Sequence, residues 1–272
     1  MSLFDLTGKV AVVTGATKGI GRGIAQELVI QGANVVVSSR SQGQCDAVAS
    51  EINHDLGAEV AKGLACDLAD LDSVLEFNKR APALWGGVDI LICNAAILPY
   101  IGPSADTPAE LFDRILIGNI HHNFRLCQGL RGELKKRGGG SIVIIGSTSG
   151  HISTPIVLAY AAAKAGVAHM ALCLADEMAG DRIRVNCVSP GTIRSYSSQK
   201  SFGAIGLVDA ARRTPLGRIG EPRDVAGTVI FLVSEAGSHV TGASIIVDGG
   251  SARLSAHGEQ DLLEPVAGRS CD

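Results

Sequence analysis

Short β-branched runs that alternate with longer amphipathic segments are the feature that most restricts how this chain can fold. Seven such runs recur along the chain, at residues 9–14, 33–39, 58–66, 88–93, 141–147, 182–189 and 243–248. Most are nearly continuous apolar runs, which is typical of strands covered by helices on both faces. The segments between them are long enough for crossover helices. The pattern therefore predicts an α/β fold with a doubly wound, seven-stranded parallel sheet.

No repeat or internal boundary interrupts this alternation, so we expect one domain over residues 1–250, within the usual size of an α/β domain. The segment 192–214 is polar, contains glycine and is too long for a simple connection, which predicts a lid. The extension 251–272 follows the last predicted strand with little periodicity. It is either disordered or docked on a neighbouring subunit.

The composition narrows the possible partners and the location. The chain has 272 residues and a formal net charge of -3, so we expect neither nucleic acid nor a membrane surface as a partner. Its start lacks a signal-peptide pattern and no apolar run reaches membrane-spanning length, which predicts a soluble, cytoplasmic protein. The seven cysteines contain no CxxC pair, and we expect buried thiols with no disulfide and no metal site.

A glycine-rich segment directly follows the first predicted strand. Gly15, Gly19 and Gly21 form a GxxxGxG pattern that opens a predicted helix. Glycine allows a tight turn and the close approach of a pyrophosphate, whose charge is met by amide groups at the helix N-terminus. The flanking strand and helix favour a dinucleotide site over a mere tight turn. Its expected cofactor-binding residues are Gly15, Thr17, Lys18, Gly19, Ile20 and Gly21. Thr14 is expected to brace this loop.

The end of the second predicted strand indicates which dinucleotide binds. Sites that prefer NAD usually place a carboxylate there for the ribose hydroxyls, whereas arginine accommodates the extra phosphate of NADP. This strand ends in Ser39 and Arg40 without an acidic residue, and Lys18 adds a second positive charge near the same corner. Both cations can be ordinary solvated side chains, yet their shared position favours NADP(H) over NAD(H).

Tyr160 and Lys164 stand four residues apart in an alanine-rich, otherwise apolar run. If this run is helical, both side chains lie on one face and can reach a common point. The same spacing occurs by chance in many helices, where lysine reaches water and tyrosine packs locally. The Tyr160–Lys164 pair therefore indicates a catalytic site only in combination with the other motifs of the chain.

Those motifs together resemble the short-chain dehydrogenase/reductase family of the single-domain type, and they are similar to those of 3-oxoacyl-(acyl-carrier-protein) reductases. The resemblance covers nearly everything from Leu6 to Gly250. Besides the glycine loop, it depends on Asp67, CNAA at 93–96, Asn119, Ser147, YAAAK at 160–164, SPG at 189–191, GRIGEPRDVA at 217–226, and the VTG and VDGG segments near the end. The order and spacing of these motifs are highly specific.

The resemblance implies a single-domain Rossmann fold and an NADP(H)-dependent oxidoreductase that interconverts a carbonyl and a secondary alcohol. It makes Asn119, Ser147, Tyr160 and Lys164 the catalytic set. Tyr160 would be the general acid or base, Ser147 would bond the substrate oxygen, and Lys164 would also hold the nicotinamide ribose. Asn119 would bind a water that links Lys164 to solvent. Because an ammonium favours phenolate, we expect Lys164 to lower the pKa of Tyr160 from its ordinary value of about 10.

The remaining cofactor contacts also come from the resemblance. They are Asp67 and Leu68 at the adenine, Asn94 and Ala95 near the adenosine ribose with Ala96 after them, Ile117 on the adjoining wall, and Pro190, Gly191 and Ile193 at the nicotinamide end. Ser195 is a further candidate at that end. Ala96 stands where relatives usually carry glycine, which is expected to narrow the floor of the site.

The substrate pocket is the least determined part of the sequence. We expect it between residues 96–101 and the lid, with Ser147, His151, Ile152, Tyr196 and Phe202 as its candidate residues. His151 can equally be a surface residue of a loop. The polar lid favours a small or polar carbonyl or alcohol over a long acyl chain.

Two further groups depart from the pattern of relatives or add to it. His121 and His122 occupy positions where small or apolar residues are common, and adjacent helical residues do not face the same way, so we expect packing at an interface and no metal site. Arg131, Lys135, Lys136 and Arg137 are either a basic patch for an acidic carrier protein or the solvated end of a helix.

The resemblance also implies a homotetramer or a homodimer, with helices around residues 108–137 and 157–179 at a subunit interface. Two alternative functions remain. One is an NAD-dependent alcohol dehydrogenase, and the other is a non-catalytic dinucleotide sensor, which the complete catalytic set argues against. An epimerase or dehydratase is disfavoured by the glycine spacing and by the lack of a separate substrate domain.

Overall fold

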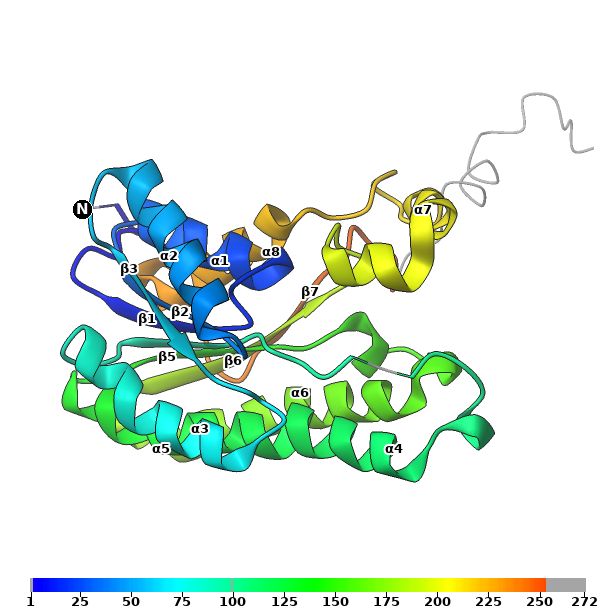
Figure 1. Cartoon of the computed structure of the whole chain (residues 1–272), viewed down its shortest axis with the longest axis horizontal. Helices are drawn as coiled ribbons and strands as arrows, with labels where there is room; N and C mark the ends of the chain where they lie inside the picture. The colour runs from blue at the N-terminus through cyan, green and yellow to red at the C-terminus, as the bar shows by residue number, and fades with distance from the viewer. Residues whose placement is uncertain (1, 99, 253–272) are drawn as a thin grey trace, which may run out of the picture.

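A computed structural model of the chain describes residues 2–98 and 100–252, and its centre is a single parallel sheet (Figure 1). The strands are β1 (Val10–Thr14), β2 (Asn34–Ser39), β3 (Ala61–Ala65), β4 (Ile90–Cys93), β5 (Gly140–Ile145), β6 (Ile183–Pro190) and β7 (Ser244–Val247). Their order in the sheet is β3-β2-β1-β4-β5-β6-β7, and all neighbours run parallel. This arrangement confirms the predicted doubly wound, seven-stranded sheet.

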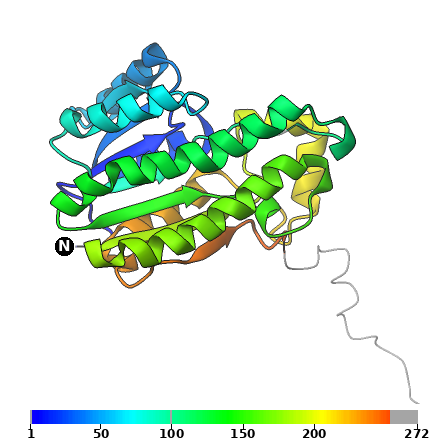
Figure 2. The same cartoon turned by 90° about the horizontal axis from the view of Figure 1, so that it is seen from below.

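Helices cover both faces of the sheet (Figures 1 and 2). One layer holds α1 (Gly19–Ile30), α2 (Gln42–Leu56) and α8 (Pro222–Val233), and the other holds α3 (Leu71–Arg80), α5 (Asn123–Lys136) and α6 (Leu158–Met178). The helix α4 (Ala109–Leu116) runs into α5 through a π-helical turn, Ile117–His122. Single 3-10 turns lie at Ala81–Leu84, Ser104–Asp106, Thr148–Gly150, Pro155–Val157, Ala179–Asp181 and Glu235–Gly237.

Each strand contributes to two separate apolar cores, one on each face of the sheet. In β2, Val35 and Val37 belong to the core beneath α1, α2 and α8, whereas Val36 belongs to the core against α3 and α5. Successive side chains of a strand point to opposite faces, so a strand covered on both sides needs apolar residues at every position. This explains why the strands appear in the sequence as continuous apolar runs.

The strand order reverses beside β1, which pairs with β2 on one side and with β4 on the other. The connections after β1 and β4 therefore leave in opposite directions and open a crevice at the carboxyl edge of the sheet. Val13 of β1 pairs with Ile92 of β4, which places the glycine loop directly beside the segment that follows Cys93. The topology thus fixes where a dinucleotide can bind.

The segment 192–214, predicted as a lid, is largely helical. Its helix α7 spans Tyr196–Arg212 and contains a kink at Gly203, whose φ of 62° breaks the helical conformation. Ser195 caps the helix in a capping box with Ser198. Figure 1 shows α7 beyond the carboxyl edge of the sheet. Most of the extension 251–272 lies outside the described residues.

The helix α6 changes one expectation from the sequence. Within Pro155–Asp181, an 18-residue window has a mean hydropathy of 1.6, so by length and composition this helix could cross a membrane. In the fold, α6 packs against β6 and the turn after β5, and it places Lys164 under the sheet edge. One side of α6 is therefore apolar because it packs in the core beneath the sheet, where Val167, Ala171 and Leu174 are buried.

Candidate active site

The glycine loop adopts a conformation that favours glycine. Gly15 and Gly19 have φ values of 64° and 58°, in the left-handed region that other residues rarely occupy. A Cβ added to Gly21 would lie 2.3 Å from the Gly15 carbonyl oxygen. The loop ends where α1 begins, with the exposed Lys18 at the N-cap and Thr17 and Ile20 on either side. Backbone amides of a helix N-terminus thus border an open cradle that suits a pyrophosphate.

Thr14 and Asn94 hold this loop from below. The Thr14 Oγ1 accepts hydrogen bonds from the backbone N–H groups of Asn94 and Ala95, both at 3.0 Å, and donates to the Ile92 carbonyl at 3.3 Å. The Asn94 Nδ2 donates to the carbonyls of Thr14 and Gly15, at 2.9 and 3.1 Å. Thr14 braces the loop as expected, and the Asn94 side chain proves to be a second brace that the sequence did not reveal.

The end of β2 carries the predicted selector of the nucleotide. Arg40 is exposed, whereas Ser39 is half-buried and its hydroxyl contacts the Cys45 thiol at 3.3 Å. Ser41 caps α2 by accepting a hydrogen bond from the Gln44 N–H. Arg40 therefore stands directly before a helix N-terminus, and this corner combines a guanidinium with the positive end of a helix dipole, which suits an anion.

The loop after β3 is held by polar contacts of its own. The Asp67 N–H donates to the Ser73 hydroxyl at 2.9 Å, and one Asp67 carboxylate oxygen accepts from the Ala69 N–H at 2.9 Å. Leu68 is buried between them. The neighbouring Ile117 is 47% exposed at the start of the π-helical turn, where a flat apolar ligand could rest on it. These contacts present Asp67 and Leu68 at the sheet edge as one ordered turn.

Tyr160 and Lys164 lie on one face of α6, next to the carboxyl end of β5. Lys164 is buried, its Nζ donates to the Ile145 carbonyl at 2.7 Å, and it lies 5.4 Å from the centre of the Tyr160 ring. The Tyr160 hydroxyl hydrogen-bonds to Ser147. The turn after Ser147 can pack closely against α6 because it contains Gly150, where an added Cβ would lie 2.7 Å from the backbone of Lys164. Three of the four predicted catalytic side chains are thus brought together.

The protonation of this pair differs from the expectation. Burial raises the pKa of Tyr160 to about 12, and the hydrogen bond to Ser147 only partly opposes it. Burial also lowers the pKa of Lys164 to about 8, with the nearby Cys187 and Cys93 thiols acting the other way. The predicted lowering of the Tyr160 pKa is therefore wrong for the chain by itself: desolvation of the phenolate raises the pKa, and Ser147, not Lys164, opposes the rise. Burial thus favours the neutral phenol over the phenolate.

Asn119 sits in the π-helical turn, and its side chain is completely buried. Its Nδ2 donates to the carbonyls of Ile97 and Ile115, at 3.0 and 2.9 Å, and its Oδ1 accepts from the Ile97 N–H at 3.2 Å. The amide is thus occupied by backbone partners and ties the loop after β4 to α4. A π turn often marks a functional position, and here it contains Asn119.

The predicted nicotinamide end lies at the carboxyl ends of β6 and β7. Pro190 and Ile193 are buried, and the Gly191 N–H donates to the Val247 carbonyl at 3.0 Å. A Cβ on Gly191 would lie 2.6 Å from Asp248 Cβ, so this turn also requires glycine. A Cβ on Gly19 would lie 3.3 Å from Ser195 Cβ, so the start of the lid contacts the glycine loop.

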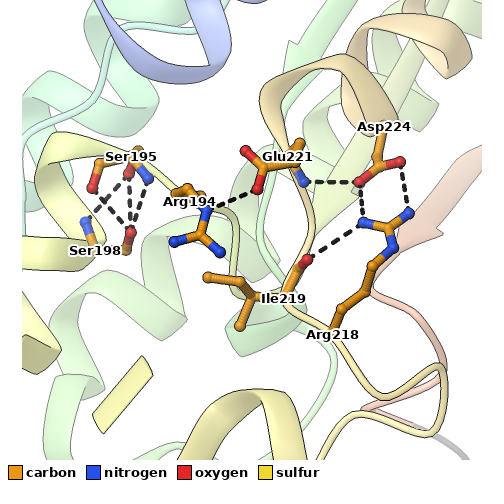
Figure 3. A network of polar contacts seen from close by, with 7 residues as sticks. All are labelled: Arg194, Ser195, Ser198, Arg218, Ile219, Glu221 and Asp224. Atoms are coloured by element: carbon orange, nitrogen blue, oxygen red, sulfur yellow. Dashed lines mark hydrogen bonds and ion pairs between the residues drawn. The ribbon is translucent and has the colours of Figure 1, made fainter. Parts of the chain in front are cut away.

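A polar network anchors the lid to the start of α8 (Figure 3). The Arg194 Nε donates to a Glu221 carboxylate oxygen at 2.7 Å. Arg218 donates two bonds to the Asp224 carboxylate, to Oδ2 at 2.6 Å and to Oδ1 at 2.9 Å, and Oδ2 also accepts the Glu221 N–H at 2.7 Å. The Arg218 guanidinium lowers the pKa of Asp224 to about 2. The sequence analysis identified the GRIGEPRDVA motif but not this anchoring role.

The substrate side is less closely defined than the cofactor side. The His151 Nε2 contacts the Ser189 hydroxyl at 2.9 Å and the Ser244 hydroxyl at 3.4 Å, which directs the ring toward β6 and β7. Ile152 and Ala96 are exposed. The side chains of Tyr196 and Phe202 lie outside what the structure describes. His151 is thus beside the site but bonded away from the Tyr160 hydroxyl.

The two histidines of the π turn behave differently. His121 is exposed, whereas His122 is buried and its Nδ1 lies 2.6 Å from the Leu68 carbonyl oxygen. Among the described residues, no group of three or more metal-ligating side chains occurs. The contact of His122 with the loop after β3 was not foreseen, because it joins segments 54 residues apart in the sequence.

The basic run near the end of α5 is paired with acids. Arg131 and Lys135 bind Asp181, and Arg131 also binds Glu177. Lys136 pairs with Glu133, and Arg137 pairs with Asp89. These contacts tie α5 to α6 and to β4, so the run is the charged, structured end of a helix and gives no support to a docking patch for an acidic carrier.

A parallel sheet with a glycine cradle at its switch point, next to a Tyr–Lys–Ser cluster, defines the class of nicotinamide-dinucleotide oxidoreductases. Residues 15–252 match the family described as Enoyl-(Acyl carrier protein) reductase. The chain is 39% identical over 252 residues to dehydrogenase/reductase SDR family member 4 of Bos taurus, covering 90% of this chain and 88% of the relative. It belongs to the short-chain dehydrogenase/reductase family.

Two solved structures show the same architecture. A 7α-hydroxysteroid dehydrogenase complexed with NADH and 7-oxo glycochenodeoxycholic acid matches with a TM-score of 0.85 and 33% identity, over 93% of this chain and 97% of that one. A putative NAD(P)-dependent gluconate 5-dehydrogenase of Beutenbergia cavernae, with bound NADP at low occupancy, matches with a TM-score of 0.87 and 32% identity, over 93% and 100%. The family therefore binds a nicotinamide dinucleotide, and relatives carry either form.

Proposed function

We propose that the protein is an NADP(H)-dependent oxidoreductase that interconverts a small carbonyl compound and the corresponding secondary alcohol. The observation that carries this proposal is the convergence of Tyr160, Ser147 and Lys164 at the carboxyl edge of β5, beside the glycine loop. NADP(H), when bound, supplies or accepts the hydride. The left-handed turns at Gly15 and Gly19, followed directly by the N-terminus of α1, support the fit of this cofactor.

Tyr160 would act as the general acid in carbonyl reduction. The hydroxyl is protonated at neutral pH, as it is at the ordinary tyrosine pKa of about 10, and this is the form that donates a proton to the carbonyl oxygen. Burial raises this pKa and so makes the hydroxyl a weaker acid until the cofactor binds, when the positive nicotinamide of the oxidised form would favour the phenolate. Ser147, which is already hydrogen-bonded to this hydroxyl, would donate to the same oxygen and stabilise its developing charge. In alcohol oxidation the phenolate is needed, so this direction should require higher pH.

Lys164 and Asn119 would prepare that proton transfer. The Lys164 ammonium, held by the Ile145 carbonyl, would bind the nicotinamide ribose hydroxyls and favour the phenolate once the proton has left. Asn119 would keep the loop after β4 in place through its bonds to Ile97 and Ile115, and a water near its turn would complete a proton path to solvent. The other cofactor contacts would be those named for Asp67, Leu68, Asn94, Ala95, Pro190, Gly191 and Ile193.

The preference for NADP(H) depends on Arg40. It is an exposed guanidinium just before α2, where the 2′-phosphate of NADP would find a positive charge and a helix N-terminus. We expect Arg40→Asp to raise the KM for NADPH at least tenfold and to leave or improve the KM for NADH. An unchanged KM for NADPH would favour the NAD-dependent alternative.

A substrate screen tests the proposal as a whole. We expect NADPH oxidation with at least one of a panel of small ketones, aldehydes, keto acids and sugar ketones, and weaker turnover with a long β-ketoacyl thioester. NADH and matched alcohols with NADP⁺ and NAD⁺ are the control arms. Tight dinucleotide binding without turnover of any carbonyl or alcohol would instead favour the sensor.

The surface of α6 supports assembly as a homotetramer or a homodimer. This helix is apolar on nearly all sides, and Leu158 and Leu172 are 45% and 51% exposed on it. An apolar face of this size is usually covered by another surface. Light scattering of the wild type should give a dimer or tetramer mass, and Leu172→Asp should reduce that mass, whereas Ile30→Asp on α1 should not.

A further inference from the structure

His122 makes a buried contact that the catalytic mechanism does not use. It lies at the end of the π-helical turn, is 4% exposed, and its Nδ1 is 2.6 Å from the carbonyl oxygen of Leu68. A carbonyl oxygen can only accept, so the Nδ1 must carry the hydrogen and donate it. The contact therefore defines the ring nitrogen that is protonated.

The π turn and the loop after β3 also approach each other at a second point. Gly118 lies four residues before His122, and a Cβ added there would be 3.4 Å from the same Leu68 oxygen. Positions four apart lie on one side of a helical segment. Two residues of the π-helical turn therefore lie next to the Leu68 carbonyl. Gly118 approaches it closely because it has no side chain, and His122 donates a hydrogen bond to it.

The peptide group between Leu68 and Ala69 is fixed at both ends by these contacts. Its carbonyl accepts from His122, and its N–H donates to the Asp67 carboxylate at 2.9 Å. The Asp67 N–H is held in turn by Ser73. A peptide plane with both polar groups bonded cannot rotate freely, so His122 sets the orientation of the Asp67–Leu68 turn.

We propose that His122 is a positioning residue for the adenine end of the cofactor site. It would act through the Leu68 carbonyl, without touching the cofactor, and so determine how tightly the adenosine half binds. This inference rests on the proposed function, because the adenine position comes from it. Tyr160 and Lys164 stand on α6 and Ser147 follows β5, away from this contact, and Asn119 in the same π-helical turn is held by its own bonds to Ile97 and Ile115. We therefore expect hydride and proton transfer not to depend on His122.

Three substitutions test the proposal. His122→Ala removes the donor, His122→Asn keeps an N–H at nearly the same place as the Nδ1, and His121→Ala is the matched control on the exposed neighbour. The measurements are KM for NADPH, kcat with the best substrate, the Kd for 2′,5′-ADP as the adenosine half, and the melting temperature.

We expect His122→Ala to raise the KM for NADPH and the Kd for 2′,5′-ADP about fivefold, as the loss of one hydrogen bond implies. The kcat at saturating NADPH should stay within about twofold, the usual scatter of such measurements. His122→Asn should restore both affinities, and His121→Ala should match the wild type. Equal affinities in His122→Ala, or a fall in kcat with no change in KM, would overturn the proposal.

A measurement on the wild-type protein covers the case in which His122→Ala does not fold. The ¹⁵N resonance of the His122 Nδ1 should shift on addition of 2′,5′-ADP and not on addition of nicotinamide mononucleotide. A shift with neither ligand would contradict the role of His122, provided that NADPH itself binds. If NADPH fails to bind the wild type, the proposed function fails, and the two failures are thereby told apart.

Discussion

The glycine-loop side and the lid side of the active site are held in different ways. Five hydrogen bonds of Thr14 and Asn94 fix the glycine loop, and each of the five joins a side chain to a backbone group. The base of the lid has two backbone hydrogen bonds, from the Arg194 N–H to the Gly220 carbonyl at 2.7 Å and from the Gly220 N–H to the Thr192 carbonyl at 2.9 Å, and the exposed Arg194–Glu221 ion pair. Its helix α7, in contrast, exposes Ile205 by 88%. Backbone bonds constrain geometry closely, whereas exposed ion pairs contribute little. The glycine loop is therefore closely held, whereas the outer side of α7 is open to change.

We expect the largest effect on activity from a change at Tyr160, which lies between the glycine loop and the lid. Tyr160→Phe removes the hydroxyl that we propose exchanges the substrate proton, and we expect kcat to fall about 10²- to 10⁴-fold. The ring and its packing remain, so the Kd for NADPH, measured by fluorescence titration, should be unchanged. Retained turnover would mean that another group supplies the proton.

A methyl group in the glycine loop tests the constrained side directly. In Gly21→Ala the added Cβ would meet the Gly15 oxygen and the Asn94 side chain at 2.3 and 2.4 Å, so the brace must move. We expect a loss of about 1–3 kcal/mol in the free energy of unfolding and a marked rise in the Kd for NADPH.

Gly227→Ala is the matched control, because this glycine lies in α8 with no atom within 4 Å of an added Cβ. A helical alanine should stabilise the protein by up to about 1 kcal/mol there and leave cofactor binding intact. Similar losses in both variants would show that glycine loss in general, and not the cradle, is responsible.

The buried Lys164 predicts how stability depends on pH. Its folded pKa of about 8 lies below the ordinary value of 10.5, so the unfolded chain binds more protons between these two pH values. The free energy of unfolding of the wild type should therefore rise with pH through this window, by about 3 kcal/mol at 1.36 kcal/mol per pH unit. Lys164→Met should lack this rise.

Urea unfolding of both proteins at pH 7.5 and pH 10 measures the difference. The value for the wild type relative to Lys164→Met should increase with pH, although the variant also loses the bond to the Ile145 carbonyl. Parallel pH profiles would show that the lysine keeps its ordinary pKa in the folded protein.

The open side should tolerate change with the smallest effect on stability. Ile205→Gln on α7 should alter the free energy of unfolding by less than about 0.5 kcal/mol, because the side chain is already in water. The buried Ile92→Val should cost about 0.5–1.5 kcal/mol. If Ile205→Gln also changes the KM for the substrate while Ile92→Val does not, α7 is part of the substrate surface.

Much of the glycine-loop side of the site could be predicted from the sequence, because local patterns determine its conformation. The glycines of the GxxxGxG segment specify left-handed turns, and the spacing of Tyr160 and Lys164 specifies a common helical face. The pKa of Tyr160 could not be predicted in this way. This pKa depends on how deeply the phenol is buried. The spacing in the sequence predicts that Lys164 lies nearby, but it does not predict how much water reaches the Tyr160 hydroxyl.

The sequence by itself determined the parallel sheet, the glycine loop and the identities of the reactive side chains, because periodicity and backbone preference act over a few residues. The tertiary structure alone decided the brace by Asn94, the pairing of the basic run with acids, the anchoring of the lid and the contact of His122 with Leu68. Each of these joins segments far apart in the chain. Their geometry depends on how whole elements pack, which no short pattern encodes.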